Sequence, residues 1–226
     1  MEEPRASPTL RRRGRPCVYG ERRFEVLRVA ARVFGESGYG HATMDDVAAA
    51  LGFTRPALYY YAKSKDALLI QCSEIAMVAL RGAAAGALNE TIGRDQLCIF
   101  LHRYCEICAD DFGRCFILAD LRQLDDPARK AIGGARLWLA QSVAAMIRRG
   151  IADGSLRDCD AELTSGMLLA TFNGVVCLRS MPAGEDQELA DAVLDVFFEG
   201  LAPRTLASRA RTRPACRSNK VESQGA

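Results

Sequence analysis

The sequence has few of the residues from which catalytic sites are commonly built. Its 226 residues include only two histidines, His41 and His102, and one tryptophan, and aromatic residues make up 7% of the chain. No Ser-His-Asp grouping is evident, and no glycine-rich phosphate loop follows a strand pattern. We therefore expect no enzymatic activity and no cofactor.

Signals for a membrane or an oxidising compartment are also missing. No uninterrupted apolar run approaches the roughly 20 residues that a membrane span requires. The N-terminus is charged from Glu2 onward and lacks the apolar core of a signal peptide. The nine cysteines are odd in number and lie mostly in apolar helical patterns, which favours reduced thiols over disulfides. We expect a cytoplasmic protein without a membrane partner.

The charged residues are divided unevenly along the chain. Residues 1–65 carry 12 basic and 7 acidic side chains, residues 66–201 carry 12 and 20, and residues 202–226 carry 6 and 1. A basic head on an acidic body predicts that the head alone approaches a polyanion, because phosphate would repel the body. The run RRRGR at 11–15 could reach into a minor groove, as slim basic arms do. The alternative is that the basic ends are simply solvated.

Apolar periodicity predicts an all-α protein. Phe24, Leu27, Ala31 and Phe34 recur at intervals of three and four, and no segment has a convincing period of two. Segments 1–18 and 202–226 lack an apolar face and are expected to be a disordered arm and tail, flanking a head at 19–65 and a body at 66–201. Helices are expected near 21–37, 43–51, 54–61, 64–86, 94–110, 114–124, 127–153, 160–181 and 185–201.

Within the head, two short helices joined by a glycine turn form the pattern of a helix-turn-helix. Thr43 and Thr54 are expected to cap the two helices, with Gly52 in the turn between them. Ala48 and Ala57 are expected where the helices cross, which leaves the other face of the second helix free for DNA. The candidate DNA-binding residues are Thr43, Thr54, Arg55, Pro56, Tyr59, Tyr60, Tyr61, Lys63 and Lys65.

The residue types in this set suggest different roles. Arg55 can donate two hydrogen bonds to a guanine edge, whereas Pro56 offers only apolar contact. Residues 61–65 follow where the chain would cross phosphates, and Thr43 starts a helix whose free N–H groups favour an anion. Because successive helical residues are about 100° apart, we expect one tyrosine of 59–61 in the core and two on the DNA.

The stretch from Val26 to Leu69 contains AAxxF at 30–34, GYxxATMxxVA at 38–48, LGFTxxxLYYY at 51–61 and SKxxLL at 64–69. Over these residues, about 45 in all, the chain resembles the TetR/AcrR family of transcriptional regulators. The chain departs from the family at Ala62, where a bulky residue such as Phe is usual. The resemblance implies an all-α homodimer, with a three-helix head that binds operator DNA and a helical body for dimerisation and for a small-molecule effector.

The resemblance also assigns roles to individual residues and a mode of action to the protein. Arg55, Pro56 and Tyr59 fall on positions that read bases or adjacent phosphates, and Thr43, Tyr60, Tyr61 and Lys65 on positions that clamp the backbone. A looser resemblance over 121–177, with DPAR at 126–129 and GxxxGxLR at 150–157, is to a subgroup that often responds to acyl-CoA or other hydrophobic ligands. We expect a repressor that a small hydrophobic or acyl-type effector releases from its operator.

An effector site would combine an apolar lining with a few polar anchors. The central helices offer such residues on their expected inward faces, although ordinary core packing explains most of them equally well. The candidate ligand-binding residues are Phe100, Tyr104, Phe116, Leu137, Trp138, Gln141, Phe172 and Asn173.

Apolar stripes on the last two helices predict a four-helix dimer interface, because two heads are needed to read an operator palindrome. The alternative is that the stripes form the core of a monomer. They comprise Leu163, Met167, Ala170, Gly174 and Cys177, and then Leu189, Val193, Val196, Phe197 and Leu201.

Two rival interpretations remain open. Cys98, His102, Cys105 and Cys108 lie near one helical face and could share a soft metal ion, as in a metal- or thiol-responsive regulator. One straight helix presents them along a line rather than around a tetrahedron, so packed reduced cysteines are favoured and no metal site is expected. The second rival is a helical protein whose basic ends bind nucleic acid without sequence preference.

Overall fold

The computed structural model describes residues 16–178 and 186–200, and all regular elements within these ranges are helical. The expected all-α class is therefore confirmed. The elements are α1 Pro16–Ser37, α2 Met44–Leu51, α3 Arg55–Tyr59, α4 Lys65–Ala87, α5 Gly93–Ala109, α6 Asp111–Leu118, the 3-10 turn η1 Leu121–Gln123, α7 Asp126–Ala152, α8 Ala161–Leu178 and α9 Asp186–Glu199.

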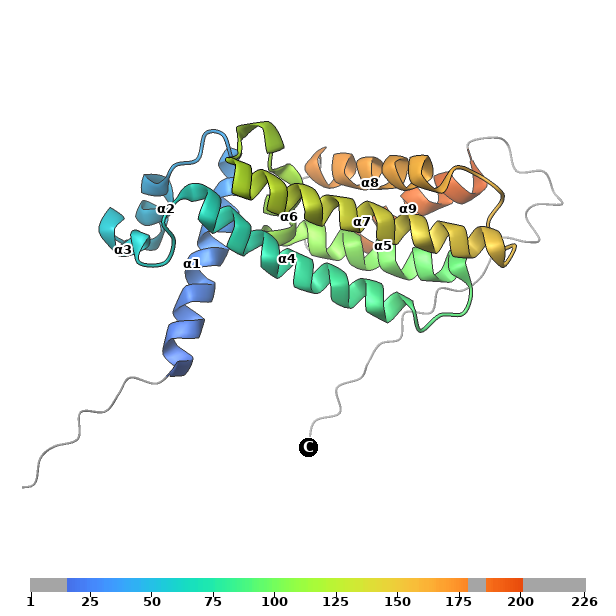
Figure 1. The fold of residues 1–226 in the computed structure, drawn as a ribbon, viewed down its shortest axis with the longest axis horizontal. Coiled ribbons are helices and arrows are strands. Elements are labelled where there is room, and N and C mark those ends of the chain that lie inside the picture. The colour runs from blue at the N-terminus through green and yellow to red at the C-terminus, as the bar shows by residue number, and fades with distance from the viewer. Residues whose placement is uncertain (1–15, 179–185, 201–226) are drawn as a thin grey trace, which may run out of the picture.

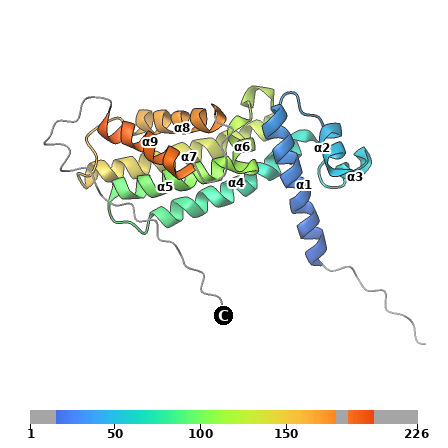
Figure 2. The ribbon, with the colours of Figure 1, turned by 180° about the vertical axis from the view of Figure 1, so that it is seen from behind.

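The helices form a small head and an elongated body. Helices α1, α2 and α3 lie together at one end, and α4 runs from that end along the bundle of α5 to α9 (Figure 1). The reverse view shows the same division, with the first half of α1 projecting away from the body (Figure 2). The proposed arm and tail fall largely on 1–15 and 201–226, which lie outside the described residues.

Local signals at the helix ends account for the shape of the head. Thr43 caps α2, as expected, and forms a complete capping box with Asp46. Gly38 and Gly52 end α1 and α2 with φ of 76° and 65°, which a residue with a Cβ rarely adopts. Ser64 accepts a hydrogen bond from the Ala67 N–H and so caps α4.

Four expectations about helix ends need correction. Helix α1 begins at Pro16, inside the segment expected to be disordered, since proline is tolerated in a first helical turn. The Thr54 side chain makes no capping hydrogen bond, and α3 ends at Tyr59 rather than near Tyr61. The helix expected at 114–124 is divided into α6 and η1.

Helix α4 is the connection between the head and the body. It packs against α1 in the head and against α5, α6 and α7 in the body. Its 23 residues would by length and composition alone suffice to cross a membrane, although polar and charged residues interrupt the apolar run. Half of the relevant window is buried inside the protein, however, which is the arrangement of a core helix.

Helix α6 forms a second connection, because it packs against both α1 and α4. The ring of Phe112 in α6 lies 5.4 Å from that of Phe24 in α1, and the Arg28 guanidinium lies over both rings. Head and body therefore share an apolar junction that a shift of α6 would disturb.

The far end of the body has a close helix contact that needs a glycine at residue 93. A Cβ on Gly93 would lie 2.1 Å from the backbone nitrogen of Gly150, so α5 and α7 can approach this closely only without a side chain at residue 93. The Asp153 carboxylate accepts from the Gly93 N–H at 2.6 Å, and Ser155 Oγ accepts from the Arg94 N–H. The GxxxGxLR pattern at 150–157 thus caps α5.

Candidate nucleic-acid interface and ligand site

Buried apolar residues fix the α2-turn-α3 unit on α1. Val47 and Leu58 are fully buried, Ala48 is 3% exposed, and Leu51 and Phe53 are half-buried. Ala57, which was expected at the helix crossing, is instead exposed, because the adjacent Leu58 takes the inward position on this short helix.

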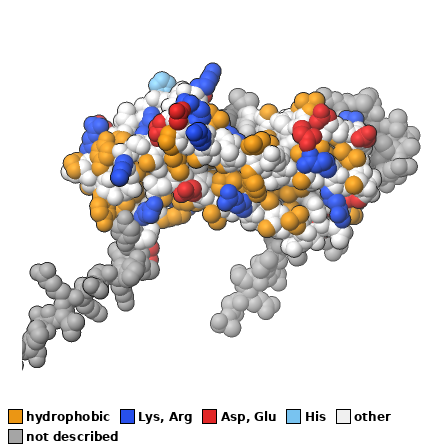
Figure 3. Space-filling model, in the orientation of Figure 1, with side chains coloured by type: hydrophobic (Ala, Val, Ile, Leu, Met, Phe, Trp, Pro, Cys, Tyr) orange, Lys and Arg blue, Asp and Glu red, His pale blue; other side chains and the backbone are white. Residues whose placement is uncertain are grey.

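The outward surface of α3 contains the residues that were expected there. Tyr59 is 40% exposed and Tyr60 is 71% exposed, whereas Tyr61 is half-buried and stacks on Phe53 with ring centroids 6.0 Å apart. The burial agrees with one inward and two outward tyrosines. Thr54, Arg55 and Pro56 are also exposed, and basic side chains are visible among hydrophobic ones at this end of the molecule (Figure 3).

Arg55 has a partner that the sequence interpretation missed. Its Nη1 donates to Asp45 Oδ2 at 3.2 Å and its Nη2 to the Tyr59 hydroxyl at 3.4 Å. A spacing rule could have found Tyr59, one turn along the same helix. No such rule relates Asp45 to Arg55, since they lie on different helices.

Thr43 is occupied by its own capping box. Its N–H and its hydroxyl both donate to Asp46 Oδ2, at 2.8 Å and 2.7 Å, and these hydrogen bonds lower the pKa of Asp46. The first turn of α2 thus already contains the carboxylates of Asp45 and Asp46. A phosphate at this helix end would have to approach beside them.

The two lysines after α3 differ in their surroundings. Lys65 Nζ donates to the carbonyl oxygens of Tyr39 and Ala42, at 2.8 Å and 3.0 Å, and lies 4.2 Å from the centroid of the Tyr39 ring. The Tyr39 hydroxyl donates to Asp66, and burial together with this carboxylate raises the pKa of Tyr39. Lys63 is exposed, with no hydrogen bond or ion pair to a described residue.

Four of the eight ligand candidates form one closed cluster around Tyr104. The Tyr104 hydroxyl donates to Asn173 Oδ1, and burial raises the Tyr104 pKa. The ring centroids of Phe100 and Phe172 lie 6.2 Å and 6.3 Å from that of Tyr104. Among the ligand candidates, the side chains with at most 1% exposure are those of Phe100, Tyr104, Phe116 and Phe172.

Three candidates lie away from this cluster or at its margin. Gln141 is exposed on α7, and Leu137 is 59% exposed, so these two are not inward as expected. Their helical phase was ambiguous because α7 is only weakly amphipathic, with small residues on several faces. Trp138 is half-buried, with the Arg81 guanidinium 5.6 Å from its ring centroid.

Arg136 is a polar residue of the body that the sequence interpretation missed. Its Nη2 donates to the carbonyls of Phe116, Ile117 and Ala119, at 2.7 Å, 3.0 Å and 2.8 Å, and so caps the end of α6 from α7. Burial lowers the pKa of Arg136, and its charge acts on the nearby Tyr104. Helix-terminal carbonyls favour a cation there, so Arg136 ties the end of α6 to α7, with its guanidinium 5.6 Å from the centroid of the Phe116 ring.

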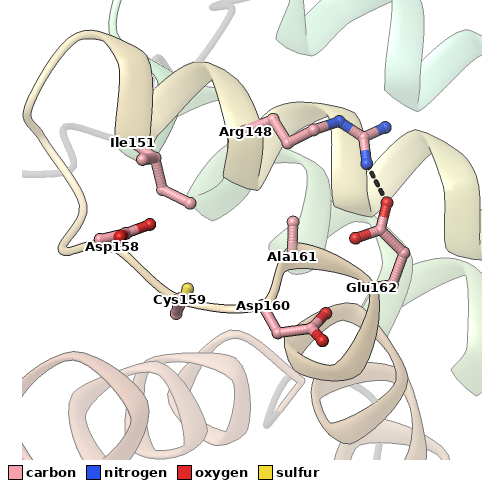
Figure 4. A pocket seen from close by; sticks show the side chains of 7 residues that line it. All are labelled: Arg148, Ile151, Asp158, Cys159, Asp160, Ala161 and Glu162. Carbon is pink, nitrogen blue, oxygen red and sulfur yellow. Dashed lines mark hydrogen bonds and ion pairs between the residues drawn. The ribbon is translucent and has the colours of Figure 1, made fainter.

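One pocket among the described residues lies elsewhere, between the end of α7 and the start of α8. It is an open hollow of about 410 Å³. An ion pair between Arg148 and Glu162 spans one side, and Asp158, Cys159 and Asp160 come from the connecting loop (Figure 4). Its charged, open lining does not suit an apolar ligand.

The cysteine and histidine residues of α5 do not converge on a common point. His102 Nδ1 lies 2.7 Å from the Cys98 carbonyl oxygen, and Nε2 lies 2.8 Å from Asp191 of α9. Cys105 and Cys108 are buried. In the described part of the chain no group of three His, Cys, Asp or Glu side chains could hold a metal ion, so the metal-responsive alternative has no geometric support there.

The stripe on α8 is left uncovered by the described residues. Leu163 and Met167 are 63% and 53% exposed, and Ala170 and Gly174 are exposed as well. On α9, Val193 is buried, Val196 is 45% exposed, and Leu189 and Phe197 are half-buried. The side chains of Cys177 and Leu201 lie outside the described residues.

Comparisons with known proteins agree with this arrangement. The model of the tetR family of bacterial regulatory proteins matches residues 26–72, and that of the tetracyclin repressor-like C-terminal domain matches residues 90–201. A curated relative, the HTH-type transcriptional repressor KstR2 of Mycolicibacterium smegmatis, is 26% identical over 165 residues, covering 66% of this chain and 74% of that protein.

Solved structures share the fold. The TetR family regulator PfmR from Thermus thermophilus has a TM-score of 0.70 and 26% identity, covering 79% of this chain and 99% of that one. The regulator FadR from Bacillus subtilis, solved in complex with stearoyl-CoA, has a TM-score of 0.64 and 19% identity, covering 79% and 99%. Because the two family models match the head and the body in turn, the chain belongs to the TetR family of bacterial regulatory proteins.

Proposed function

We propose that this DNA-binding regulator is a cytoplasmic repressor that binds operator DNA as a homodimer and is released by an acyl-type effector. The observation that carries the proposal is the packed α2-turn-α3 unit, which exposes Arg55, Pro56 and Tyr59 together on a family-matched head. This short helix is suited to the major groove, where arginine can read a guanine edge.

Phosphate contacts would surround this base-reading centre. Thr54, Tyr60 and Lys63 are exposed beside it, and we assign them to the DNA backbone together with Thr43, Tyr61 and Lys65. Lys63 is the best placed of these for a phosphate, because it is not held by hydrogen bonds to described residues. The arginines of 11–15 would add contacts in a flanking minor groove.

A homodimer would present two such heads to a palindromic operator. The uncovered α8 stripe supports this, since apolar residues at one-turn intervals are suited to pack against a second copy. With one head per half-site, the separation of the heads would decide whether both fit the DNA.

Two observations support an acyl-type effector: the ligand of a solved structure with the same fold, and the apolar side chains inside the body. FadR from Bacillus subtilis binds stearoyl-CoA on the same fold. Phe100, Phe116 and Phe172 offer an apolar lining, and Tyr104 and Asn173 offer polar anchors. An acyl chain would have to separate these packed rings, and α6 lies beside them.

Release from DNA would follow from the two connections between body and head. An acyl chain that displaces α6 would disturb its contacts with α1 and α4 and so change the separation of the heads. A coupling free energy of about 1–3 kcal/mol is enough to change occupancy severalfold or more.

The experiment begins with selection of duplexes from a randomised library by the purified protein. Binding of the enriched duplex is then measured by fluorescence anisotropy, alone and with stearoyl-CoA, a short-chain acyl-CoA, or free CoA. We expect an enriched palindrome and at least a fivefold loss of affinity with one acyl-CoA but not with free CoA. Enrichment of no sequence would contradict operator recognition, and acyl-CoA binding without a change in DNA affinity would contradict the release mechanism.

A further inference from the structure

Two side chains hold the guanidinium of Arg55 in the free protein. Its Nη1 lies 3.2 Å from Asp45 Oδ2 of α2, and its Nη2 lies 3.4 Å from the Tyr59 hydroxyl. The guanidinium carbon also lies 5.8 Å from the centroid of the Tyr59 ring. Asp45 takes no part in the capping box, which uses Asp46, so its described partner is the base-reading candidate itself.

The pair between Asp45 and Arg55 contributes little to folding. The side chains are 63% and 57% exposed, and ion pairs in such surroundings are weak because water and salt screen them. The buried Val47 and Leu58 already fix α2 and α3 on the head. We therefore expect the pair to affect the orientation and the effective charge of the Arg55 side chain rather than the stability of the fold.

Asp45 leaves Arg55 able to read a base. A guanidinium has five N–H groups, and Asp45 and Tyr59 accept one each, which leaves three. A bidentate contact with guanine O6 and N7 needs only two of them. The two contacts favour one arrangement of the long side chain before docking, which reduces part of the entropy that it loses on contact with the base.

The same carboxylate makes Arg55 less attractive to the DNA backbone. Phosphates attract any exposed cation without regard to sequence, and this attraction supplies non-specific binding. The negative charge of Asp45 offsets that of the guanidinium and repels a phosphate that approaches the pair. A base edge carries no net charge, so it meets much less repulsion.

We propose that Asp45 is a positioning residue that sets the specificity of operator recognition through Arg55. It turns the guanidinium toward a base edge and removes one attractive contact for phosphate from the DNA-facing surface. This inference rests on the proposed reading of operator DNA by α3.

The test compares the parent protein with Asp45→Asn on two duplexes. One is the duplex that the parent enriches from a randomised library, and the other is its scrambled counterpart of equal length and composition. Anisotropy titrations at several salt concentrations give both affinities and their salt dependence. For Asp45→Asn we expect a ratio of the two affinities lower by about threefold to tenfold, and a salt slope on the scrambled duplex steeper by about one phosphate contact.

Three further variants separate the proposed role from a general charge effect. In an Arg55→Ala background, Asp45→Asn should leave the ratio unchanged, because the residue through which it acts is gone. Glu74→Gln removes an exposed carboxylate of α4 that has no hydrogen bond or ion pair to a described residue, and it should keep the parent ratio. Asp45→Glu retains the charge and should restore most of the discrimination.

Two results would overturn the inference. One is an Asp45→Asn protein with the ratio and the salt slope of the parent, and the other is an equal effect of Asp45→Asn with and without Arg55. A parent that enriches no sequence from the library contradicts the proposed function itself, and the role of Asp45 falls with it. A parent that discriminates normally while Asp45→Asn changes nothing contradicts the role of Asp45 alone.

Discussion

At the scale of single residues, Lys65 has two roles, because it stabilises the fold of the head and lies at a position that the family resemblance assigns to the DNA backbone. Its ammonium group donates to two backbone carbonyls of the α1–α2 connection, those of Tyr39 and Ala42. Lys63, two positions earlier, is exposed without such bonds to described residues. The family resemblance assigns Lys65 to the DNA backbone, but the fold already holds its ammonium group. Lys63 is the lysine that is available to bind a phosphate.

Substitution of each lysine should separate the contribution to stability from the contribution to DNA binding. Lys65→Met should lower the free energy of unfolding by about 1–2 kcal/mol, because two half-buried carbonyls lose a charged donor. Lys63→Met should change it by less than about 0.5 kcal/mol, while weakening binding to specific and scrambled duplexes alike. Urea denaturation and anisotropy measure the two effects. Parent-like stability of Lys65→Met would show that its carbonyl bonds contribute nothing.

The two threonines at the helix starts of the head form a second matched pair. Thr43→Ala should cost about 1 kcal/mol of stability, because the capping box of α2 loses its side-chain acceptor. Thr54→Ala should cost less than about 0.5 kcal/mol, since its hydroxyl caps nothing. Thermal unfolding of the two variants checks the difference. Equal losses would contradict the geometry of the two caps.

At the scale of elements, the sequence predicted features that depend on near neighbours in the chain. The helix cap at Thr43 and the left-handed glycine at 52 are local, so residue type and spacing locate them. The outward position of Ala57 and the contact of Asp45 with Arg55 depend on how α2 and α3 pack. Gln141 was misplaced for a related reason, because the sequence of α7 does not settle which face it buries.

The packing of α6 against α5 gives the prediction at this scale. A Cβ on Gly113 would lie 1.9 Å from the Ile107 carbonyl oxygen and 2.8 Å from the Cys108 Cα, and backbone atoms cannot move aside as a side chain can. Gly113→Ala should therefore destabilise the protein by about 1–3 kcal/mol. Gly134→Ala, on an open face of α7, should stabilise it by up to about 1 kcal/mol.

Urea denaturation of the two glycine variants decides the point. If Gly113→Ala does not fold, Gly134→Ala still tests whether an alanine is favourable in an unobstructed helix of this protein. A Gly113→Ala protein as stable as the parent would mean that α6 can leave α5 at little cost. In that case α6 could not transmit a displacement from the ligand cluster to the head.

At the scale of the whole molecule, the body encloses the aromatic cluster among its candidate ligand residues and leaves its α8 surface uncovered. Tyr104 and Phe172 pack into a closed core, so the described residues show the proposed ligand site only as a cluster of side chains. The sequence pattern could propose those side chains by type, but not whether they would line a cavity or fill it. The α8 stripe has the opposite character, because a surface that is apolar at one-turn intervals is available for a partner.

Charge placed on that stripe should uncouple dimerisation from the fold of each subunit. Met167 is 53% exposed, so Met167→Asp removes little buried packing within the subunit, but in a dimer it would bury an unpaired carboxylate. Analytical ultracentrifugation should then find a monomer, and affinity for a palindromic duplex should fall by about a hundredfold or more, because the second head no longer binds at a high effective concentration. Binding to a single half-site should remain within about twofold of the parent, since each head is intact.

Val78→Asp introduces the same charge at a 70% exposed position of α4 and should leave both the dimer and its DNA affinity unchanged. If Met167→Asp remained dimeric, the two copies would meet through another surface, and the separation of the heads would have to be derived from that surface instead of α8.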